Sequence, residues 1–149
     1  MYTCDLQQSE AVNIAVAETH GPMVEVPANI PVLLEKVATY LTSNGYAPGA
    51  CYVVYDEFTD DAMRMRAGFA VSQDISESDD VKVMQMPANT TAHTTHYGSY
   101  DGIPAAHQAV REWCAANGHE ELDMSWEIYG EWYEDESKLV TDIHVAVAT

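Results

Sequence analysis

A single glutamate in an apolar, aromatic stretch is the residue of this chain best suited to do chemistry. Glu127 follows Trp126 and precedes Ile128 and Tyr129. In a strand, side chains alternate, so Glu127 and Tyr129 share one face while Trp126 and Ile128 take the other. An ionised carboxylate inside a sheet lowers stability unless it is paired or hydrogen-bonded. A bound cation or a tyrosine hydroxyl meets that need, so Glu127 is the first candidate for a ligand-binding residue.

The aromatic residues are the second set of candidates. The chain has nine tyrosines and three tryptophans against two phenylalanines. Tyrosine and tryptophan combine a flat apolar face with a polar group, which suits a pocket for drug-like molecules. A cation over such a face gains about 0.5 to 2 kcal/mol. The expected pocket aromatics are Tyr129, Tyr55, Tyr97, Tyr100 and Phe69.

The histidines and cysteines predict no metal site. His93 and His96 are three residues apart, a spacing that points them to opposite faces of a strand. His107 and His119 belong to a helix and the loop after it, without the further donors that zinc needs. The three cysteines are scattered and form no Cys-x-x-Cys pair. Nucleotide-binding glycine loops and nucleophile elbows are missing too, so we expect no metal and no cofactor.

Charge and hydropathy restrict the partners and the location. Six basic residues face 24 acidic ones, giving a formal net charge of −18. Such a field repels phosphate backbones, which predicts no direct binding to nucleic acid. It favours cationic ligands or a basic protein partner, or it serves only to keep the protein soluble, and charge alone does not choose between these roles. Neither a bilayer-spanning apolar run nor a signal-peptide pattern occurs, so we expect no membrane association and a cytoplasmic location. A length of 149 residues fits one domain, residues 1–149.

Two helix-like segments, residues 29–45 and 102–118, are copies of one another. Ile30-Pro31 recurs as Ile103-Pro104, and Asn44-Gly45 recurs as Asn117-Gly118, at one constant offset. The pattern predicts a helix capped near Asn29, with Pro31 in its first turn, and a second capped near Gly102. Such a repeat indicates two equivalent supersecondary units. We place them at about residues 1–73 and 80–149.

The segments between the helices have strand patterns. Residues 49–58, 63–71, 125–133 and 138–148 follow the helices, and residues 2–7, 13–18, 79–86 and 92–98 precede them. Strand, helix and hairpin, twice over, predict an α+β fold made of duplicated β-α-β-β units. We expect an antiparallel sheet with two helices on one face. The groove between the repeats, with Glu127 in it, is expected on the face that the helices leave free.

The motifs of the second half resemble a known family. His96-Tyr97-Gly98-Ser99-Tyr100 precedes a helix that carries Trp113, and Trp126-Glu127-Ile128-Tyr129 follows that helix. In this order, the pieces are similar to the GyrI-like small-molecule-binding domain, the effector-binding domain of certain bacterial multidrug-responsive transcription activators. The resemblance covers essentially the whole chain. It implies a duplicated sandwich with an aromatic pocket around a central glutamate, which Glu127 matches.

The resemblance leaves three functions open. The first is a stand-alone binding protein for lipophilic cationic or aromatic small molecules, and this is the function we expect rather than an enzyme. The second is a hydrolase of reactive small molecules in which Glu127 is the general acid or base, because burial raises a carboxyl pKa. The third is an acidic module that binds or inhibits a basic protein. We expect no DNA-binding segment in this chain.

Overall fold

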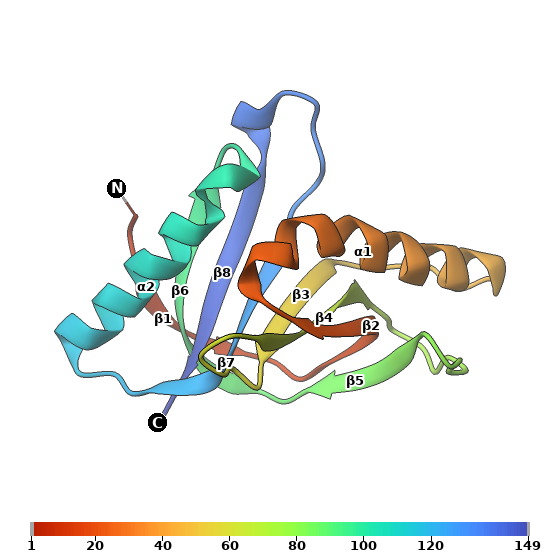
Figure 1. Ribbon diagram of the computed structural model, residues 1–149, viewed down its shortest axis with the longest axis horizontal. Helices are drawn as coiled ribbons and strands as arrows, with labels where there is room; N and C mark the ends of the chain where they lie inside the picture. Colours follow the sequence, from red (N-terminus) through yellow and green to blue (C-terminus); the bar gives the residue numbers. More distant parts are fainter. Residues whose placement is uncertain (1, 149) are drawn as a thin grey trace. The chain divides into compact units, whose positions relative to one another are not determined.

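The computed structural model describes residues 2–148, which form two compact units. The N-terminal unit is Ala11–Pro87, and the C-terminal unit combines residues 2–10 with residues 88–148. Within the described residues, each unit has one α-helix and four strands (Figure 1). The α+β class and the antiparallel strand pairing predicted from the sequence are confirmed.

The C-terminal unit holds the strands and the helix that position Glu127. Its strand order is β1-β6-β8-β7, with every neighbouring pair antiparallel. The helix α2 connects β6 to the hairpin formed by β7 and β8. The elements are β1 (Asp5–Ser9), β6 (Asn89–Tyr97), the 3-10 turn η2 (Tyr100–Gly102), α2 (Ile103–Asn117), β7 (Glu121–Tyr129), the 3-10 turn η3 (Glu136–Lys138) and β8 (Val140–Val147).

The N-terminal unit repeats this arrangement. Its strand order is β5-β2-β4-β3, again antiparallel throughout, and its helix connects β2 to the hairpin formed by β3 and β4. The elements are β2 (Val12–Gly21), the 3-10 turn η1 (Met23–Glu25), α1 (Val26–Ser43), β3 (Cys51–Asp56), β4 (Met63–Ala70) and β5 (Lys82–Met86). The predicted β-α-β-β repeat is therefore present in both units.

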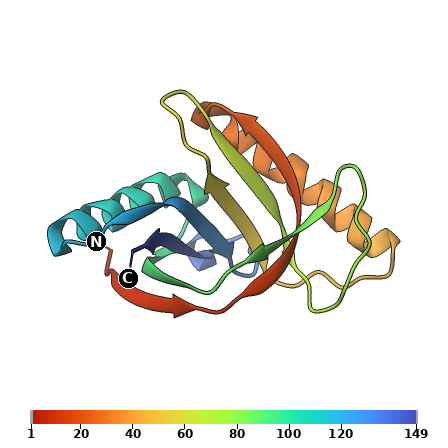
Figure 2. The ribbon, with the colours of Figure 1, turned by 90° about the horizontal axis from the view of Figure 1, so that it is seen from below.

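The edge strands do not follow the boundaries expected from the sequence repeat. β1 was expected to lead into the first helix, but it pairs with β6, far away along the chain (Figure 2). Side chains reinforce this pairing, because Gln8 exchanges hydrogen bonds with Thr90 and Ser9 bonds the backbone of Asn89. β5 likewise pairs with β2. The compact units therefore differ from residues 1–73 and 80–149.

Each helix packs an apolar stripe on its own sheet. In α1 the buried residues are Leu33, Val37 and Leu41. In α2 they are Ile103, Ala106, Val110 and Cys114, which form one cluster with Ala92 of β6 and with Ile143, Val145 and Val147 of β8. This cluster identifies the face of the C-terminal sheet that carries α2, and the opposite face carries no helix of that unit.

The helix ends follow the sequence signals with one exception. Gly102 caps the start of α2, and Gly118 ends it in the left-handed conformation with φ 72°. The cap predicted at Asn29 is wrong, because α1 begins at Val26 after Glu25 and contains Pro31 in its interior. Pro27 occupies the first turn, where a proline needs no backbone N–H donor. The earlier proline therefore sets the start of the helix.

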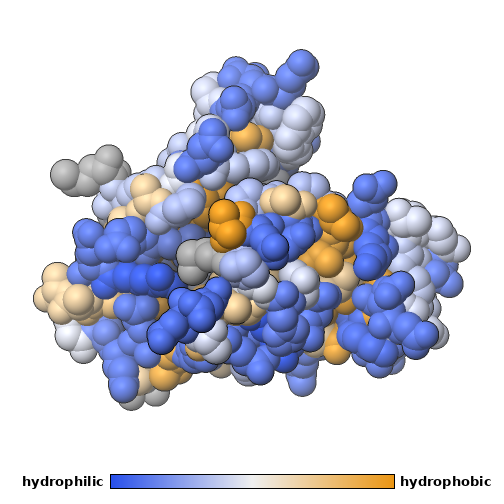
Figure 3. All heavy atoms as spheres, in the orientation of Figure 1, coloured by the Kyte–Doolittle hydropathy of each residue, from blue (hydrophilic) through white to orange (hydrophobic). Residues whose placement is uncertain are grey.

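The surface reflects the acidic composition. Hydrophilic residues cover most of the face seen in Figure 3, with small apolar patches between them. Among the described residues, no helix is long and apolar enough to cross a membrane.

Candidate functional site

Glu127 is a buried carboxylate with two short hydrogen bonds. Its residue is 2% exposed and lies in β7. The Tyr129 hydroxyl donates to Oε1 at 2.7 Å, and Nε2 of His107 donates to Oε2 at 2.7 Å. Both oxygens thus accept hydrogen bonds, which compensates much of the desolvation that burial imposes on a charge. The predicted role of a tyrosine hydroxyl in satisfying Glu127 is confirmed.

His107 is the partner that sequence reasoning missed. It was assigned to a helix without a role, yet α2 brings it onto Glu127 from twenty residues away. The signal was available, because His107 follows Ile103 by four residues and precedes Val110 by three, within the apolar stripe of α2. A polar residue in such a stripe faces the core and needs a partner there. Of the two side chains, His107 is the more exposed, so it covers Glu127.

The face on which Glu127 lies differs from the expected one. Glu127 is paired across the sheet with Ile143, which packs against α2. Its bond to His107 of α2 confirms that the side chain points toward that helix. The expectation that Glu127 lies on the helix-free face is therefore wrong. The alternation itself is confirmed, because Trp126 points the other way and stacks on His144.

The aromatic candidates divide into three groups. Tyr100, in η2, meets the ring of Tyr129 edge-on with centroids 5.2 Å apart, so these two tyrosines lie together near Glu127. Tyr97 ends β6 and is 71% exposed, at a surface position rather than in the core. Tyr55 and Phe69 belong to the N-terminal unit, in β3 and β4. Their participation in one groove with Glu127 stays a prediction.

Tyr55 lies in the sheet of the N-terminal unit much as Tyr129 lies in that of the C-terminal unit. Tyr55 is paired with Met65 across β3 and β4. Met65 lines a small hollow together with Val26, the first residue of α1. Tyr55 and the fully buried Val53 therefore occupy the face that carries α1. The predicted correspondence of Tyr55 and Tyr129 agrees with this placement within each unit.

A second polar cluster occupies the helix-free face of the C-terminal unit. His93 and His144 are paired across β6 and β8, with ring centroids 4.8 Å apart, and His144 stacks on Trp126 at 5.4 Å. Nε2 of His93 lies 2.8 Å from Asp142, and its Nδ1 lies 2.9 Å from Asp5 of β1. The imidazole of His93 thus bridges two carboxylates and helps to hold the edge strand.

These two histidines have opposite electrostatic environments. The hydrogen bond to Asp142 raises the pKa of His93 above its ordinary value, against the effect of burial, and Asp5 acts in the same direction. Burial, assisted by the positive charge of His93, lowers the pKa of His144 to about 4. His144 is therefore a neutral core histidine, whose Nδ1 bonds the Thr91 hydroxyl at 2.9 Å.

His96 lies on the face that carries α2, so the prediction that His93 and His96 point to opposite faces is confirmed. Its Nδ1 bonds the Tyr2 hydroxyl at 2.8 Å, and its Nε2 bonds the Ser99 carbonyl at 2.7 Å. Gly102 passes so close that an added Cβ would lie 2.5 Å from the imidazole Cε1. A side chain at this position would therefore displace the His96 imidazole from its two hydrogen bonds.

The N-terminal unit has an arginine cluster in place of histidines. Asp56 accepts hydrogen bonds from Nε and Nη2 of Arg64 and from Nη2 of Arg66, all at 2.7 to 2.8 Å. Although burial by itself raises the pKa of Asp56, the hydrogen bonds and charges of the two arginines outweigh it and lower that pKa. This cluster ties β3 to β4 and is a structural ion pair.

The part of the chain that the structure describes was searched for clusters suited to a metal ion and for paired cysteines. Groups of three or more histidine, cysteine, aspartate and glutamate side chains with metal-binding geometry do not occur among residues 2–148. The cysteines Cys4, Cys51 and Cys114 are free thiols. Cys114 lies in the core of the C-terminal unit, as a small apolar side chain.

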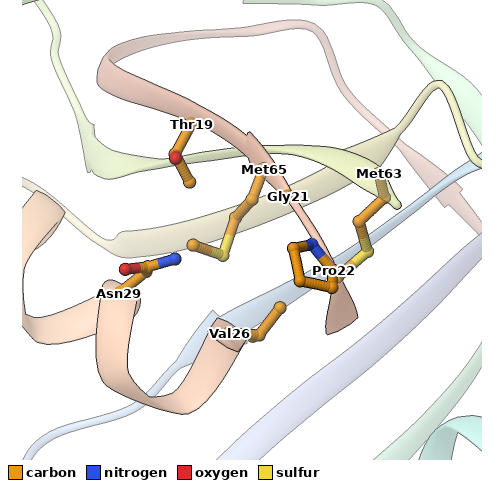
Figure 4. A pocket seen from close by; sticks show the side chains of 7 residues that line it. All are labelled: Thr19, Gly21, Pro22, Val26, Asn29, Met63 and Met65. Carbon is orange, nitrogen blue, oxygen red and sulfur yellow. The ribbon is translucent and has the colours of Figure 1, made fainter. Parts of the chain in front are cut away.

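A small hollow lies beside the start of α1, apart from the candidate residues. Figure 4 shows side chains from α1, β2 and β4 around it, Met63 and Met65 of β4 among them. Its volume is about 10 Å³, room for about one water molecule and far below the roughly 300 to 1,000 Å³ of drug-sized sites. None of the candidate residues lines it. The lining residues are Thr19, Gly21, Pro22, Val26, Asn29, Met63 and Met65.

Comparison with known families settles the identity of the fold. The GyrI-like small molecule binding domain matches residues 3–148. The chain belongs to this GyrI-like family. The resemblance drawn from the motifs around His96 and Trp126 is thereby confirmed, and the match covers nearly the whole chain. No curated protein matches the chain in sequence.

Solved structures share the fold of this GyrI-like protein at low sequence identity. The C-terminal domain of EcmrR has a TM-score of 0.83 and 18% identity, over 100% of this chain and 99% of that one. SAV2435 bound to tetraphenylphosphonium has a TM-score of 0.73 and 15% identity, over 98% and 94%. A hydrolase encoded by lin2189 from Listeria innocua has a TM-score of 0.65 and 9% identity, over 98% and 92%.

One similar structure is a longer chain on DNA. EcmrR in a complex with DNA has a TM-score of 0.81 and 18% identity, and the match covers 99% of this chain but 58% of the EcmrR chain. At these identities, the comparisons establish the fold, and the family match establishes a small-molecule-binding domain.

Proposed function

We propose that this protein binds amphipathic cations at Glu127, beneath α2 of the C-terminal unit. The observation that carries the proposal is a carboxylate, 2% exposed, whose two oxygens are held by the polar side chains of His107 and Tyr129. A buried carboxylate of this kind attracts a positive charge that enters from solvent. The aromatic rings of Tyr129 and Tyr100 provide apolar faces next to that charge.

The ligand class follows from charge and surroundings together. A net charge of −18 raises the local concentration of cations around the protein. The family match makes the domain a small-molecule binder, and SAV2435, which has the same fold, is bound to a lipophilic cation. An inter-repeat groove that adds Tyr55 and Phe69 to the site is part of this proposal, and so is a cytoplasmic location.

The direct test compares a cation with a neutral molecule of similar size. Tetraphenylphosphonium and triphenylphosphine oxide are titrated by calorimetry into the wild-type protein and into Glu127→Gln. We expect the cation to lose at least about tenfold in affinity, about 1.4 kcal/mol, while the neutral compound is nearly unaffected. An equal loss for both compounds means that Glu127 shapes the site without supplying its charge. Absence of saturable binding by any lipophilic cation tested contradicts the proposal.

The chain contains a matched control for this substitution. Glu131 is also a glutamate with a tyrosine two residues later, and the Tyr133 hydroxyl donates to Glu131 Oε2 at 3.1 Å. This second pair is exposed to solvent. Glu131→Gln removes the same charge from the surface and should leave the affinity for the cation unchanged within about twofold, because exposed charges are screened. A loss equal to that of Glu127→Gln assigns the effect to net charge.

The hydrolase alternative uses the same residue and stays a prediction. In this function Glu127 is the general acid or base, and its contact with His107 places a second polar group beside it. Turnover of a strained electrophile that is abolished by both Glu127→Gln and His107→Gln favours this function. Binding of lipophilic cations without any turnover favours the binding protein. A basic protein partner for the acidic surface also stays a prediction.

A further inference from the structure

Thr141 has a buried hydroxyl without a hydrogen-bond partner among the described residues. Its residue is fully buried in β8, and Oγ1 is one of the few buried polar atoms in residues 2–148 with no partner. A buried hydroxyl left unsatisfied costs about 1 to 3 kcal/mol. Such a group therefore needs a reason, and a ligand that bonds it on entry is one.

Thr141 lies next to the Glu127 site. Across β7 and β8 it is paired with Tyr129, on the face that carries α2, and Glu127 is the next residue of β7 on that face. Diagonal neighbours of this kind in a sheet lie about 7 to 8 Å apart between Cα atoms. One polar group of a ligand can therefore bond Glu127 while a second bonds Thr141.

The neighbours of Thr141 explain why its hydroxyl is left over. Tyr129, its partner in β7, directs its hydroxyl to Glu127 at 2.7 Å. His96, its partner in β6, bonds Tyr2 through Nδ1 and the Ser99 carbonyl through Nε2. Both flanking side chains thus direct their polar atoms elsewhere, and Thr141 Oγ1 keeps its donor and acceptor capacity unused.

The present bonds of Glu127 indicate what kind of cation fits. Both oxygens accept directed bonds, one from an O–H and one from the N–H of His107. A ligand that replaces His107 at Oε2 restores this bond only if it carries a hydrogen-bond donor, and in a protonated amine that donor is an N–H on the charged nitrogen. A quaternary cation offers charge but no donor, and charge-assisted hydrogen bonds are about twice as strong as neutral ones.

We propose that this site selects protonated amines with at least two N–H groups over quaternary cations, with Glu127 accepting one N–H and Thr141 Oγ1 accepting a second. The proposal rests on the proposed function, because it assigns a ligand class to the same site. Thr141 is then a specificity-determining residue: it distinguishes among cations by the number of N–H donors that they carry. The orphaned hydroxyl of Thr141 is satisfied only in the complex.

The test uses three amines that differ only in methylation. Desipramine, imipramine and N-methylimipramine carry two, one and no N–H groups on a cationic nitrogen at neutral pH, on the same tricyclic body. We expect affinity to fall by about threefold or more at each methylation, and by about tenfold or more across the series. Equal affinities, or a preference for the quaternary compound, overturn the proposal. Binding of none of the three removes the proposed function itself, a result distinct from loss of the ranking.

Thr141→Val assigns the contribution of the hydroxyl. We expect this variant to bind desipramine and imipramine about equally, while the gap between imipramine and the quaternary compound remains. The control is Thr94→Val, since Thr94 is also fully buried but its hydroxyl already bonds the Thr3 carbonyl at 2.8 Å. This control should keep the full ranking. If Thr141→Val keeps the full ranking too, or lowers all three affinities by the same factor, Thr141 has no role in specificity.

Discussion

The two units of this protein share one topology and differ in what lies under the helix. In the C-terminal unit, His107 of α2 bonds Glu127 of β7. At the corresponding positions of the sequence repeat, the N-terminal unit has Leu34 in α1 and Val53 in β3. Val53 is fully buried. Tyr55 lies two residues after Val53, just as Tyr129 lies two residues after Glu127.

This difference separates the requirements of the fold from those of a site. An apolar pair is sufficient to pack a helix on a sheet, because burial of aliphatic side chains supplies the stabilisation. A buried polar pair adds desolvation that its hydrogen bonds only offset, so apolar substitutes for such pairs are often neutral or stabilising. The N-terminal unit shows that the fold does not need the polar pair. We infer that the C-terminal unit keeps His107 and Glu127 for binding.

The largest expected effect comes from placing the charge in the wrong unit. Val53→Glu buries a carboxylate under α1 in a position built for an aliphatic side chain, and it should lower the free energy of unfolding by about 4 kcal/mol or more. Urea denaturation followed by circular dichroism measures this. Adding Leu34→His should recover part of the loss if the two positions correspond to His107 and Glu127. A fully stable Val53→Glu protein shows that the correspondence is incorrect.

A smaller effect is expected from breaking the pair in the unit that has it. His107→Leu leaves Glu127 buried without its imidazole bond and should cost about 2 to 3 kcal/mol in unfolding free energy. The double variant His107→Leu with Glu127→Val copies the N-terminal unit and should return to wild-type stability or exceed it, with loss of cation binding. A double variant that loses the sum of both single effects contradicts a binding role for the pair, since the pair is then needed for stability.

The hydrogen bonds of Glu127 also change what is expected of Glu127→Gln. If Glu127 were only an unpaired buried charge, it would lower the stability of the unliganded protein. Glu127→Gln would then be at least as stable as the wild type. Because two short bonds hold the carboxylate, we now expect the neutral amide to lower the unfolding free energy by about 1 kcal/mol.

A change of pH, rather than a substitution, distinguishes the helix-free faces of the two units. The pKa of His144 is about 4 in the folded protein and 6.5 ordinarily, so the unfolded chain binds this proton first as pH falls. Stability is therefore lost between about pH 6.5 and 4, by about 2 to 4 kcal/mol from this group. His93 has a raised pKa, so its contribution is full below about pH 6.5 and is lost as pH rises through its folded pKa.

The ion pairs of Asp56 in the N-terminal unit do not change stability in this pH range. The pKa of Asp56 is lowered, so its contribution to the unfolding free energy is lost only as pH falls below about 3.8. Imidazole NMR titration of the intact protein measures His93 and His144 directly. In His93→Gln, the pKa of His144 should rise, since the positive charge beside it is gone. A wild-type His144 that titrates near its ordinary value contradicts the assignment of a buried neutral imidazole.

Local patterns in the sequence determined much of the fold and part of the site. Alternation along β7 fixed that Glu127 and Tyr129 share a face opposite Trp126, because successive side chains of any strand point to opposite sides. The second helix-like segment was predicted to end at residue 118, and Gly118 does end α2. The repeat predicted two equivalent β-α-β-β units, and the motifs predicted the GyrI-like family.

Only the tertiary structure decided which partners these residues meet. The pairing of β1 with β6, the contact of His107 with Glu127 and the unsatisfied hydroxyl of Thr141 each depend on segments distant in sequence. Strand period gives two possible faces but does not say which one the helix covers, so the face of Glu127 was assigned wrongly. The rotation of α2 and the register of β7 against β8 fix that choice, and both are set by packing of the whole unit rather than by any local pattern.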